Sequence, residues 1–209
     1  MMEESRILQE FKDADAILTG HFVLSSGLRS PMYVQCARVL IDARRADRLC
    51  KALAEKLKQW AGESSQSFDI IVSPAMGGVV VGYEMGRQLG LPAIFCERVD
   101  GVFALRRGFG LEKGQRVLIV EDVVTTGKSS MEAVACIEQY GAKAVAVASL
   151  IDRRSDNDVG LTLPLISLLK LDIPTYAPDA LPDALKAIEP VKPGSRFLFL
   201  VPSPKKGEG

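Results

Sequence analysis

Apolar runs that alternate with amphipathic helical segments constrain the fold of this chain more than any other feature of the sequence. The runs with strand character cover residues 69–73, 93–96, 116–120 and 144–151, and segments with helical spacing cover residues 42–61, a stretch ending at Leu89, and residues 130–140. Continuous apolar strands are typical of a parallel sheet that is covered on both faces. The alternation therefore predicts an α/β fold with a central, mostly parallel sheet flanked by helices, whose ligands bind at the carboxyl ends of the strands.

The two ends of the chain are less regular. Residues 3–18 carry apolar side chains at helical spacing, which predicts a short helix, and residues 21–34 alternate and then turn through serines and a glycine, which predicts a pair of strands. The stretch from Asp172 onward is rich in proline and ends with an apolar run at 197–201 and a charged tail, and its structure is left open.

Composition excludes several classes of function. Lysine plus arginine equals aspartate plus glutamate at 26 each, so the chain has no net charge that would collect nucleic acid or anionic lipid. The four cysteines lie far apart, which argues against a disulfide framework and a zinc site and favours the cytoplasm. The acidic N-terminus does not suit a signal peptide, and no apolar run approaches the ~20 residues that span a bilayer. A small polar ligand suits this chain best.

The chemistry is concentrated in residues 117–129, VLIVEDVVTTGKS. An apolar strand delivers Glu121 and Asp122 to its carboxyl end, and Ser129 and Glu132 have the spacing of a capping box, which predicts that a helix starts there with its free amides facing the turn. Carboxylates accept hydrogen bonds from sugar hydroxyls, and a glycine-containing loop before a helix binds phosphate through its amides. The segment therefore predicts a phosphorylated sugar as ligand.

This segment has two other interpretations. Gly-Lys-Ser at 127–129 suggests a Walker A loop, but that motif needs a glycine five positions before Gly127, where Asp122 stands. The second interpretation is an ordinary turn from strand to helix with solvated acids.

The apolar run, two acids, two further residues and Thr-Thr-Gly together resemble the signature of the type I phosphoribosyltransferases. The resemblance implies their fold, with an N-terminal helix and small hood in residues 1–40, an α/β core in residues 41–171 and an extension of uncertain structure in residues 172–209. It also implies that the acids hold the ribose hydroxyls while the following loop surrounds the 5-phosphate. The implied ribose phosphate site is Glu121, Asp122, Val123, Val124, Thr125, Thr126, Gly127, Lys128 and Ser129.

A second glycine-containing turn, Pro74-Ala-Met-Gly-Gly78, also lies between a strand and a helix. Its glycines permit backbone amides to approach an anion, although glycines in such turns more often serve packing. In the resembling family this position is the pyrophosphate loop, which implies that Ala75, Met76 and Gly77 bind pyrophosphate together with Arg98.

Residues 20–33, GHFVLSSGLRSPMY, resemble the N-terminal part of orotate phosphoribosyltransferases, and this segment selects orotate over purines. The resemblance implies that Ser26 and Gly27 contact the base, and a plain hairpin with a serine turn is the alternative. Arg153 follows the strand that ends at Ile151, and its guanidinium can form forked hydrogen bonds to a planar anionic base. Arg153 matches the family's orotate-contacting arginine, and Thr125 matches a residue that touches both base and phosphate.

The implied reaction transfers ribose 5-phosphate from phosphoribosyl pyrophosphate to orotate, giving orotidine 5′-phosphate and pyrophosphate in pyrimidine synthesis. Positive charge grows on the ribose ring while pyrophosphate leaves, so the enzyme must stabilise both charges. The resemblance implies Mg²⁺ on the pyrophosphate, a mobile loop at residues 97–113 and a homodimer in which that loop reaches the neighbouring site. Asp122, Arg106 and Arg107 are the implied catalytic residues, and no residue is assigned as a metal ligand.

The chain departs from the family pattern in its cations. Residues 97–113 contain arginines where the family carries lysines and a histidine, and Met76 and Ser25 stand where lysines are usual. Arginine replaces the charge of lysine but cannot donate a proton in catalysis. Two rivals therefore stay open: a phosphoribosyltransferase for another base, such as adenine, xanthine or uracil, and a non-catalytic regulator that binds a sugar phosphate or nucleotide on the same fold.

Overall fold

The chain divides into two compact units in a computed structural model that describes residues 2–24, 26–155 and 160–193. The core unit comprises Met1–Ile17 and Gln35–Asp172, and the small unit comprises Leu18–Val34 and Ile173–Gly209. The small unit therefore combines residues of the predicted hood with residues of the predicted C-terminal extension.

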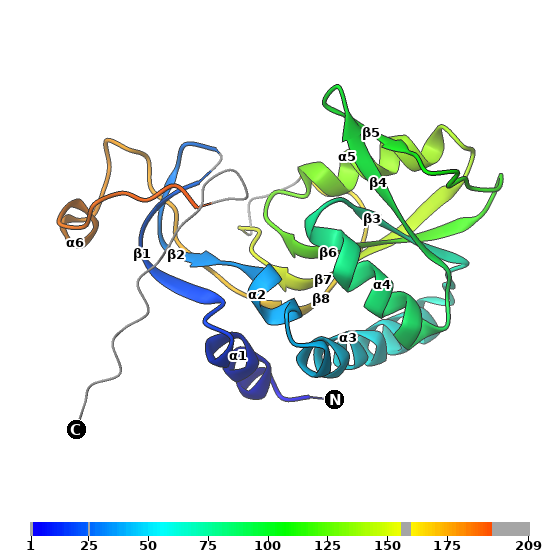
Figure 1. Ribbon diagram of the computed structural model, residues 1–209, viewed down its shortest axis with the longest axis horizontal. Helices are drawn as coiled ribbons and strands as arrows, with labels where there is room; N and C mark the ends of the chain where they lie inside the picture. The colour runs from blue at the N-terminus through cyan, green and yellow to red at the C-terminus, as the bar shows by residue number, and fades with distance from the viewer. Residues whose placement is uncertain (1, 25, 156–159, 194–209) are drawn as a thin grey trace. The chain divides into compact units, whose positions relative to one another are not determined.

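A six-stranded sheet forms the centre of the core unit (Figure 1). Its order is β5 (Val102–Leu105), β4 (Ala93–Val99), β3 (Ile70–Pro74), β6 (Arg116–Val124), β7 (Lys143–Asp152) and β8 (Leu165–Lys170). Every neighbouring pair is parallel except β4 and β5. The predicted mostly parallel α/β sheet is confirmed, and β8 is a strand that the sequence did not indicate.

Helices cover both faces of this sheet (Figure 1). The first face is covered by α3 (Ala43–Ser64) and α4 (Gly77–Leu89), and the other by α5 (Lys128–Glu138). The side chain of Asp42 accepts hydrogen bonds from the amides of Arg44 and Arg45, which fixes the start of α3 after the short α2 (Cys36–Leu40). Both faces of β3, β6 and β7 are thus covered, which explains their continuous apolar runs.

The first helix, α1 (Glu4–Asp13), is shorter than the predicted 3–18. It ends because Asp15 takes a left-handed backbone conformation, with φ +49°, and Ile17 already belongs to a strand. Glu10 of α1 forms an ion pair with Arg45 and a forked pair with Arg48, which joins this helix to α3.

Three glycines of α4 lie at four-residue spacing and face the sheet: Gly78, Gly82 and Gly86. A Cβ atom on Gly82 would lie 2.0 Å from Oγ of the buried Ser73 on β3. Because side chains are missing along this stripe, the helix packs close to β3 and its N-terminus is positioned at the carboxyl ends of β3 and β6.

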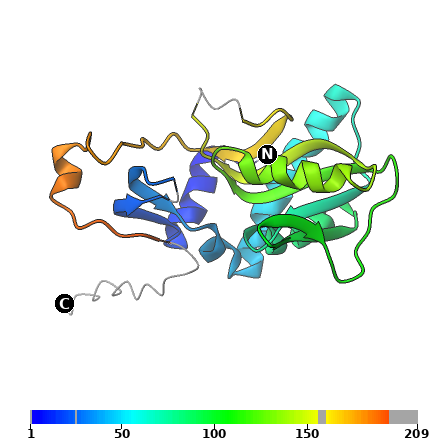
Figure 2. The same cartoon turned by 90° about the horizontal axis from the view of Figure 1, so that it is seen from above.

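In the small unit, β1 (Ile17–Val23) and β2 (Arg29–Val34) form a two-stranded sheet, which confirms the predicted strand pair. Residues 173–193 run alongside both strands (Figure 2). Val191 pairs with Phe22 on β1, and Tyr176 pairs with Arg29 on β2. This segment also contains α6 (Asp183–Lys186). The apolar run at 197–201 lies outside the described residues.

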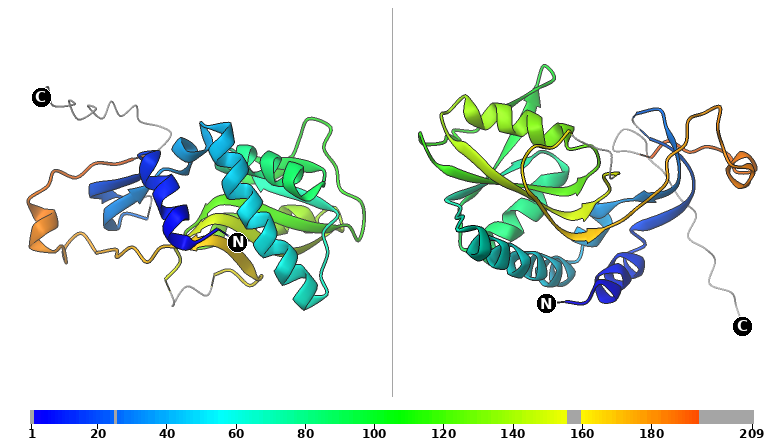
Figure 3. Two further views of the ribbon diagram at one scale, coloured as in Figure 1. Left: turned by 90° about the horizontal axis from the view of Figure 1, so that it is seen from below. Right: turned by 180° about the vertical axis from the view of Figure 1, so that it is seen from behind.

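The stretch 97–113, predicted as a loop, is partly a hairpin. β4 continues to Val99, and β5 returns antiparallel to it after a turn at Asp100-Gly101. Both turn residues have positive φ, at +50° and +87°, as a tight turn between two strands requires. The hairpin contacts α5 (Figure 3). Among the described helices, none is both long and apolar enough to cross a membrane.

Candidate active site

The two glycine-containing turns meet at one edge of the sheet. β3 and β6 are parallel neighbours, so both turns leave from their carboxyl ends. A Cβ atom on Gly77 would lie 2.8 Å from Oδ1 and 2.9 Å from Oδ2 of Asp122, which places the carboxylate directly against the start of α4. The turn before Gly77 contains a cis peptide bond between Ala75 and Met76. The Ala75 amide donates to the carbonyl of Cys96 at 2.8 Å, and Met76 is 82% exposed. A side chain at position 77 would therefore displace the Asp122 carboxylate from its present position.

Glu121 and Asp122 point to opposite faces of the sheet, as successive residues of an extended strand do. Asp122 faces α4, and its Oδ1 accepts a hydrogen bond from the Val123 amide at 2.9 Å. Glu121 faces α5 and accepts a hydrogen bond from the hydroxyl of Ser130. The sequence prediction did not distinguish the faces of the two side chains: because the strand continues to Val124, its alternation directs them to opposite faces near the carboxyl end of β6.

Burial governs the electrostatics of both acids. Glu121 is 9% exposed, and burial raises its pKa to about 7, against the lowering effect of the Ser130 hydrogen bond and with smaller raising effects from Asp122 and Glu132. Burial likewise raises the pKa of the half-buried Asp122, while hydrogen bonds from backbone amides lower it. Neither acid forms an ion pair within the described part of the chain.

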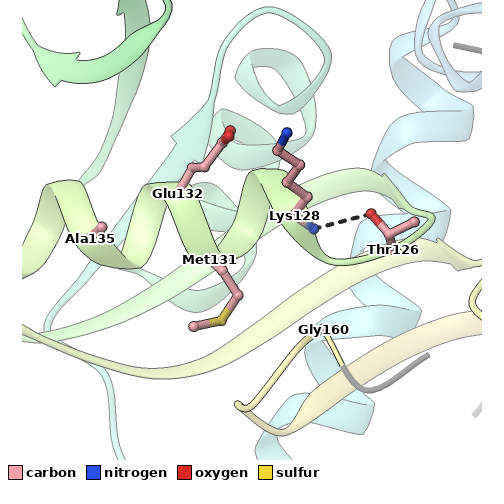
Figure 4. Close-up of a pocket in the computed structure, with 6 residues that line it drawn as sticks. All are labelled: Thr126, Lys128, Met131, Glu132, Ala135 and Gly160. Carbon is pink, nitrogen blue, oxygen red and sulfur yellow. Dashed lines mark hydrogen bonds between the residues drawn. The ribbon is translucent and has the colours of Figure 1, made fainter. Parts of the chain in front are cut away.

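The predicted capping box is wrong. α5 begins at Lys128, and its cap is Gly127 with φ +78°, without a side-chain hydrogen bond to the cap. Glu132 instead forms an ion pair with Arg98. The hydroxyl of Thr126 accepts from the Lys128 amide at 3.3 Å, inside the loop (Figure 4). The hydrogen bond between Thr126 and Lys128 thus lies within the turn, and the first helical residue is Lys128, one position before Ser129.

The phosphate-loop residues differ in exposure. The exposed residues Thr125, Thr126 and Lys128 lie in or beside the turn, whereas Val124 and Gly127 are buried and Val123 and Ser129 are partly buried. A Cβ atom on Gly127 would lie 2.7 Å from Cβ of Leu161, so the loop packs tightly against residues 160–161. The N-terminal amides of α5 follow this turn, where an anion is favoured.

An open pocket of about 470 Å³ lies along α5, lined by Thr126, Lys128, Met131, Glu132, Ala135 and Gly160 (Figure 4). Figure 4 shows the side chains of Lys128 and Glu132 on one side of the helix and Met131 on the other, toward Gly160. Neither acid of the motif lines this pocket. The pocket therefore lies on the outer side of the predicted phosphate loop.

The arginines of the hairpin are held in different ways. Arg98 donates to the carbonyl of Gly101 at 2.7 Å, pairs with Glu132 and lies 4.2 Å from the centre of the Phe103 ring. Arg107 pairs with Glu97 at 3.2 Å. Arg106 is exposed, and its guanidinium makes no hydrogen bond or ion pair with the residues that the structure describes. Only Arg106 of the three is available to a ligand without breaking an existing contact.

The predicted base-binding residues lie in both units. The Arg153 amide donates to the carbonyl of Val124 at 2.8 Å, which places Arg153 beside the start of the predicted phosphate loop. The adjacent Arg154 forms a forked pair with Asp152 at 3.0 Å. In the small unit, Ser26 and Gly27 are exposed in the turn between β1 and β2, where the Ser26 hydroxyl accepts from the Leu28 amide at 3.4 Å.

Residues 2–24, 26–155 and 160–193 contain no group of three or more histidine, cysteine, aspartate or glutamate side chains that could hold a metal ion. All four cysteines are free and buried, as expected from their spacing. Sequence reasoning missed Ser130 as a contact of the motif, because the hydrogen bond joins a strand to a helix and no local spacing indicates it.

Residues 43–161 match the model of the family described as phosphoribosyl transferase domain. An orotate phosphoribosyltransferase of Rhizorhabdus wittichii is 55% identical over 199 residues, which cover 93% of this chain and 97% of the relative. An orotate phosphoribosyltransferase of Parvibaculum lavamentivorans is 51% identical over 197 residues, covering 94% of this chain and 100% of the relative.

Among solved structures, an orotate phosphoribosyltransferase from Aeropyrum pernix superposes with a TM-score of 0.64 at 26% identity, covering 79% of this chain and 93% of that one. An adenine phosphoribosyltransferase from Thermoanaerobacter pseudethanolicus superposes with a TM-score of 0.55 at 22% identity, covering 67% of this chain and 88% of that one. The likeness to the adenine enzyme extends to the fold alone.

Proposed function

The chain belongs to the phosphoribosyltransferase family and, within it, to the orotate phosphoribosyltransferases, and we propose that it transfers ribose 5-phosphate from phosphoribosyl pyrophosphate to orotate, giving orotidine 5′-phosphate and pyrophosphate. The observation that carries this proposal is the contact of the Asp122 carboxylate with Gly77, which joins the two glycine-containing turns at one sheet edge. A ligand with a phosphate at one end and a pyrophosphate at the other fits two such turns.

Each turn has a separate task in the transfer. The amides and hydroxyls of residues 125–129 bind the 5-phosphate, and residues 75–77 bind the pyrophosphate. Asp122 accepts hydrogen bonds from the ribose hydroxyls between them and carries negative charge beside the ring as positive charge grows there. The pyrophosphate loop lacks a lysine, so the backbone amides of Met76 and Gly77 supply the electrostatic stabilisation together with Arg98, which leaves Glu132 to do so.

Mg²⁺ would be held at this site mainly by the phosphates of the substrate. The described chain lacks an all-protein cluster of metal ligands, and Mg²⁺ commonly binds through substrate phosphates while it retains several waters. When bound, the ion would supply positive charge that neutralises the pyrophosphate leaving group. We assign no residue of the chain as its ligand.

The remaining cations act on the leaving group and the base. Arg106, which has no partner in the described residues, is the first candidate to close over the pyrophosphate, and Arg107 follows if it leaves Glu97. Arg153 forms forked hydrogen bonds with orotate, while Thr125 contacts both base and phosphate. Ser26 and Gly27 stay predicted contacts of the base.

We propose a homodimer in which the hairpin loop of one subunit completes the site of its partner. An apolar face on α4 supports this: Met76, Val80 and Tyr83 are 82%, 51% and 73% exposed and lie at helical spacing on one side. This face starts at the pyrophosphate turn, so a second copy that covers it lies beside the site. Four free cysteines suit a cytoplasmic location.

The direct test follows the ultraviolet absorbance of orotate in the presence of phosphoribosyl pyrophosphate and Mg²⁺, with adenine, xanthine and uracil as competing bases. We expect consumption of orotate only, and a loss of roughly 10²–10³-fold in kcat/KM for Asp122→Asn. Asp13→Asn, at the exposed end of α1, is the matched control and retains the wild-type rate. Turnover of another base in place of orotate refutes the assignment, and binding of phosphoribosyl pyrophosphate without turnover of any base supports the regulator.

A further inference from the structure

The carboxylate of Glu121 is held from outside its own strand. Ser130, in the first turn of α5, is 0% exposed, and its hydroxyl donates a hydrogen bond to Oε1 of Glu121. Oε2 has no hydrogen bond in the part of the chain that the structure describes, and it is not among the side-chain atoms sealed from solvent. One oxygen is therefore anchored while the other remains available.

The two acids are fixed in different ways. Asp122 is oriented by the next amide along the chain, Val123 N, at 2.9 Å, and by its contact with Gly77. Glu121 has one more rotatable bond than an aspartate, and loss of that freedom on substrate binding has an entropic cost. The Ser130 hydroxyl removes this freedom before the substrate arrives.

We propose that Ser130 is a positioning residue, which fixes Glu121 so that its free oxygen binds a ribose hydroxyl and which couples that carboxylate to the helix that binds the 5-phosphate. The inference rests on the proposed function, because it assigns a task within the same site. Ser130 itself touches no substrate, and its hydroxyl acts through Glu121.

The groups around Glu121 give this hydrogen bond an electrostatic consequence. Asp122 on the same strand and Glu132 on α5 both raise the pKa of Glu121, as burial does, and Cys96 on β4 is a buried thiol whose pKa is raised to about 12 and which therefore stays uncharged. The Ser130 hydroxyl is the group that opposes these effects. Without it, a larger fraction of Glu121 is protonated at neutral pH.

The experiment compares Ser130→Ala and Ser130→Thr with the wild type by two measurements. The first is a carboxyl ¹³C NMR titration of the free protein, with Glu121→Gln to assign the resonance. The second is the pH dependence of kcat/KM for phosphoribosyl pyrophosphate. For Ser130→Ala we expect the Glu121 titration and the acid limb of the rate profile to move upward together by about 0.5–1 pH unit. At pH 7 kcat/KM falls roughly threefold, and it recovers at pH 9. Threonine keeps the hydroxyl and restores the wild-type limb.

The matched control is Ser149→Ala. Ser149 is a buried serine that lies opposite Glu121 on β7, but its hydroxyl bonds to the carbonyl of Ile151 and to Ser167. We expect Ser149→Ala to shift neither the NMR titration of Glu121 nor the acid limb of the kcat/KM profile. A Ser130→Ala protein whose Glu121 titrates as in the wild type, or whose rate falls equally at every pH, overturns the proposal. Because the NMR titration needs no turnover, a wild type that does not consume orotate refutes the proposed function separately.

Discussion

At the scale of single residues, the sequence predicted that Glu121 and Asp122 lie at the end of a strand, but not that their side chains face different helices. The prediction treated both as charges at a strand end, whereas the strand extends to Val124 and its alternation sends one acid to each face. Once the strand is known to extend to Val124, the alternation of side chains predicts that the two acids face opposite sides of the sheet. The contact of Glu121 with Ser130 was not, because it depends on how α5 packs on the sheet.

The raised pKa of Glu121 predicts a pH dependence of stability. Its pKa rises from 4.5 unfolded to about 7 folded, so the folded state binds the additional proton and gains stability that is fully present below pH 4.5 and lost as pH rises through 7. Because glutamine does not ionise, the Glu121→Gln variant does not lose this contribution to stability as the pH rises. We expect its stability relative to the wild type to increase by about 3 kcal/mol at most between pH 4.5 and pH 8, measured by urea unfolding.

Glu138→Gln is the control for this measurement, because Glu138 is exposed at the end of α5. Its change in stability over the same range is the baseline against which the change for Glu121→Gln is judged. If the stability difference between Glu121→Gln and the wild type does not change with pH, the pKa of Glu121 is the same in the folded and the unfolded protein, which contradicts the prediction.

At the scale of elements, apolar runs predicted the parallel strands and their helices, because burial on both faces leaves a strong local signal. The errors fall where backbone conformation overrides pattern. The Ser129 capping box failed because Gly127, with φ +78°, starts the helix earlier. The β4–β5 hairpin was missed although Asp100-Gly101 is a favoured sequence for a two-residue turn. The polar, Arg-rich composition of residues 97–113 indicated a loop, whereas β4 and β5 are held together by backbone hydrogen bonds that do not depend on composition.

The glycine stripe of α4 predicts a strong effect of added volume. Gly82→Ala places a methyl group against Ser73, so the helix has to move, and we expect a loss of about 1–3 kcal/mol in the free energy of unfolding. Gly62→Ala in α3 has no atom within 4 Å of its new methyl group and is expected to stabilise by about 0.5–1 kcal/mol. In a Ser73→Ala background the penalty of Gly82→Ala becomes smaller, as a double-mutant cycle measures. Equal penalties in both backgrounds would show that Ser73 does not limit the approach of α4.

At the scale of the whole molecule, the association of residues 18–34 with residues 173–193 was not predictable from the sequence. Val191 and Tyr176 pair with β1 and β2 through backbone groups across more than 140 positions of chain, and backbone pairing leaves no side-chain pattern. The sequence therefore indicated the strands of the small unit but not the segment that completes it.

The proposed dimer predicts the effect of charge on the α4 face. Val80→Glu with Tyr83→Glu places two carboxylates on that face, and we expect the protein to change from twice 22.6 kDa to a monomer of 22.6 kDa by light scattering. Tyr140→Glu, which changes a tyrosine that is 38% exposed just after α5, leaves the mass of the wild type unchanged. A dimer that persists in the double variant would place the interface elsewhere.

If the two subunits share their hairpin loops, two inactive variants should complement each other in a mixed dimer. If Arg106 serves the partner's site, then Arg106→Ala and Asp122→Asn inactivate sites through different subunits. A heterodimer of the two variants has one site with both changes and one with neither. Unfolding and refolding an equal mixture should therefore recover about a quarter of the wild-type activity, because half of the dimers are mixed and each has one intact site. If Arg106 serves the site of its own subunit, each site of the heterodimer carries one change and the mixture stays as inactive as its parents.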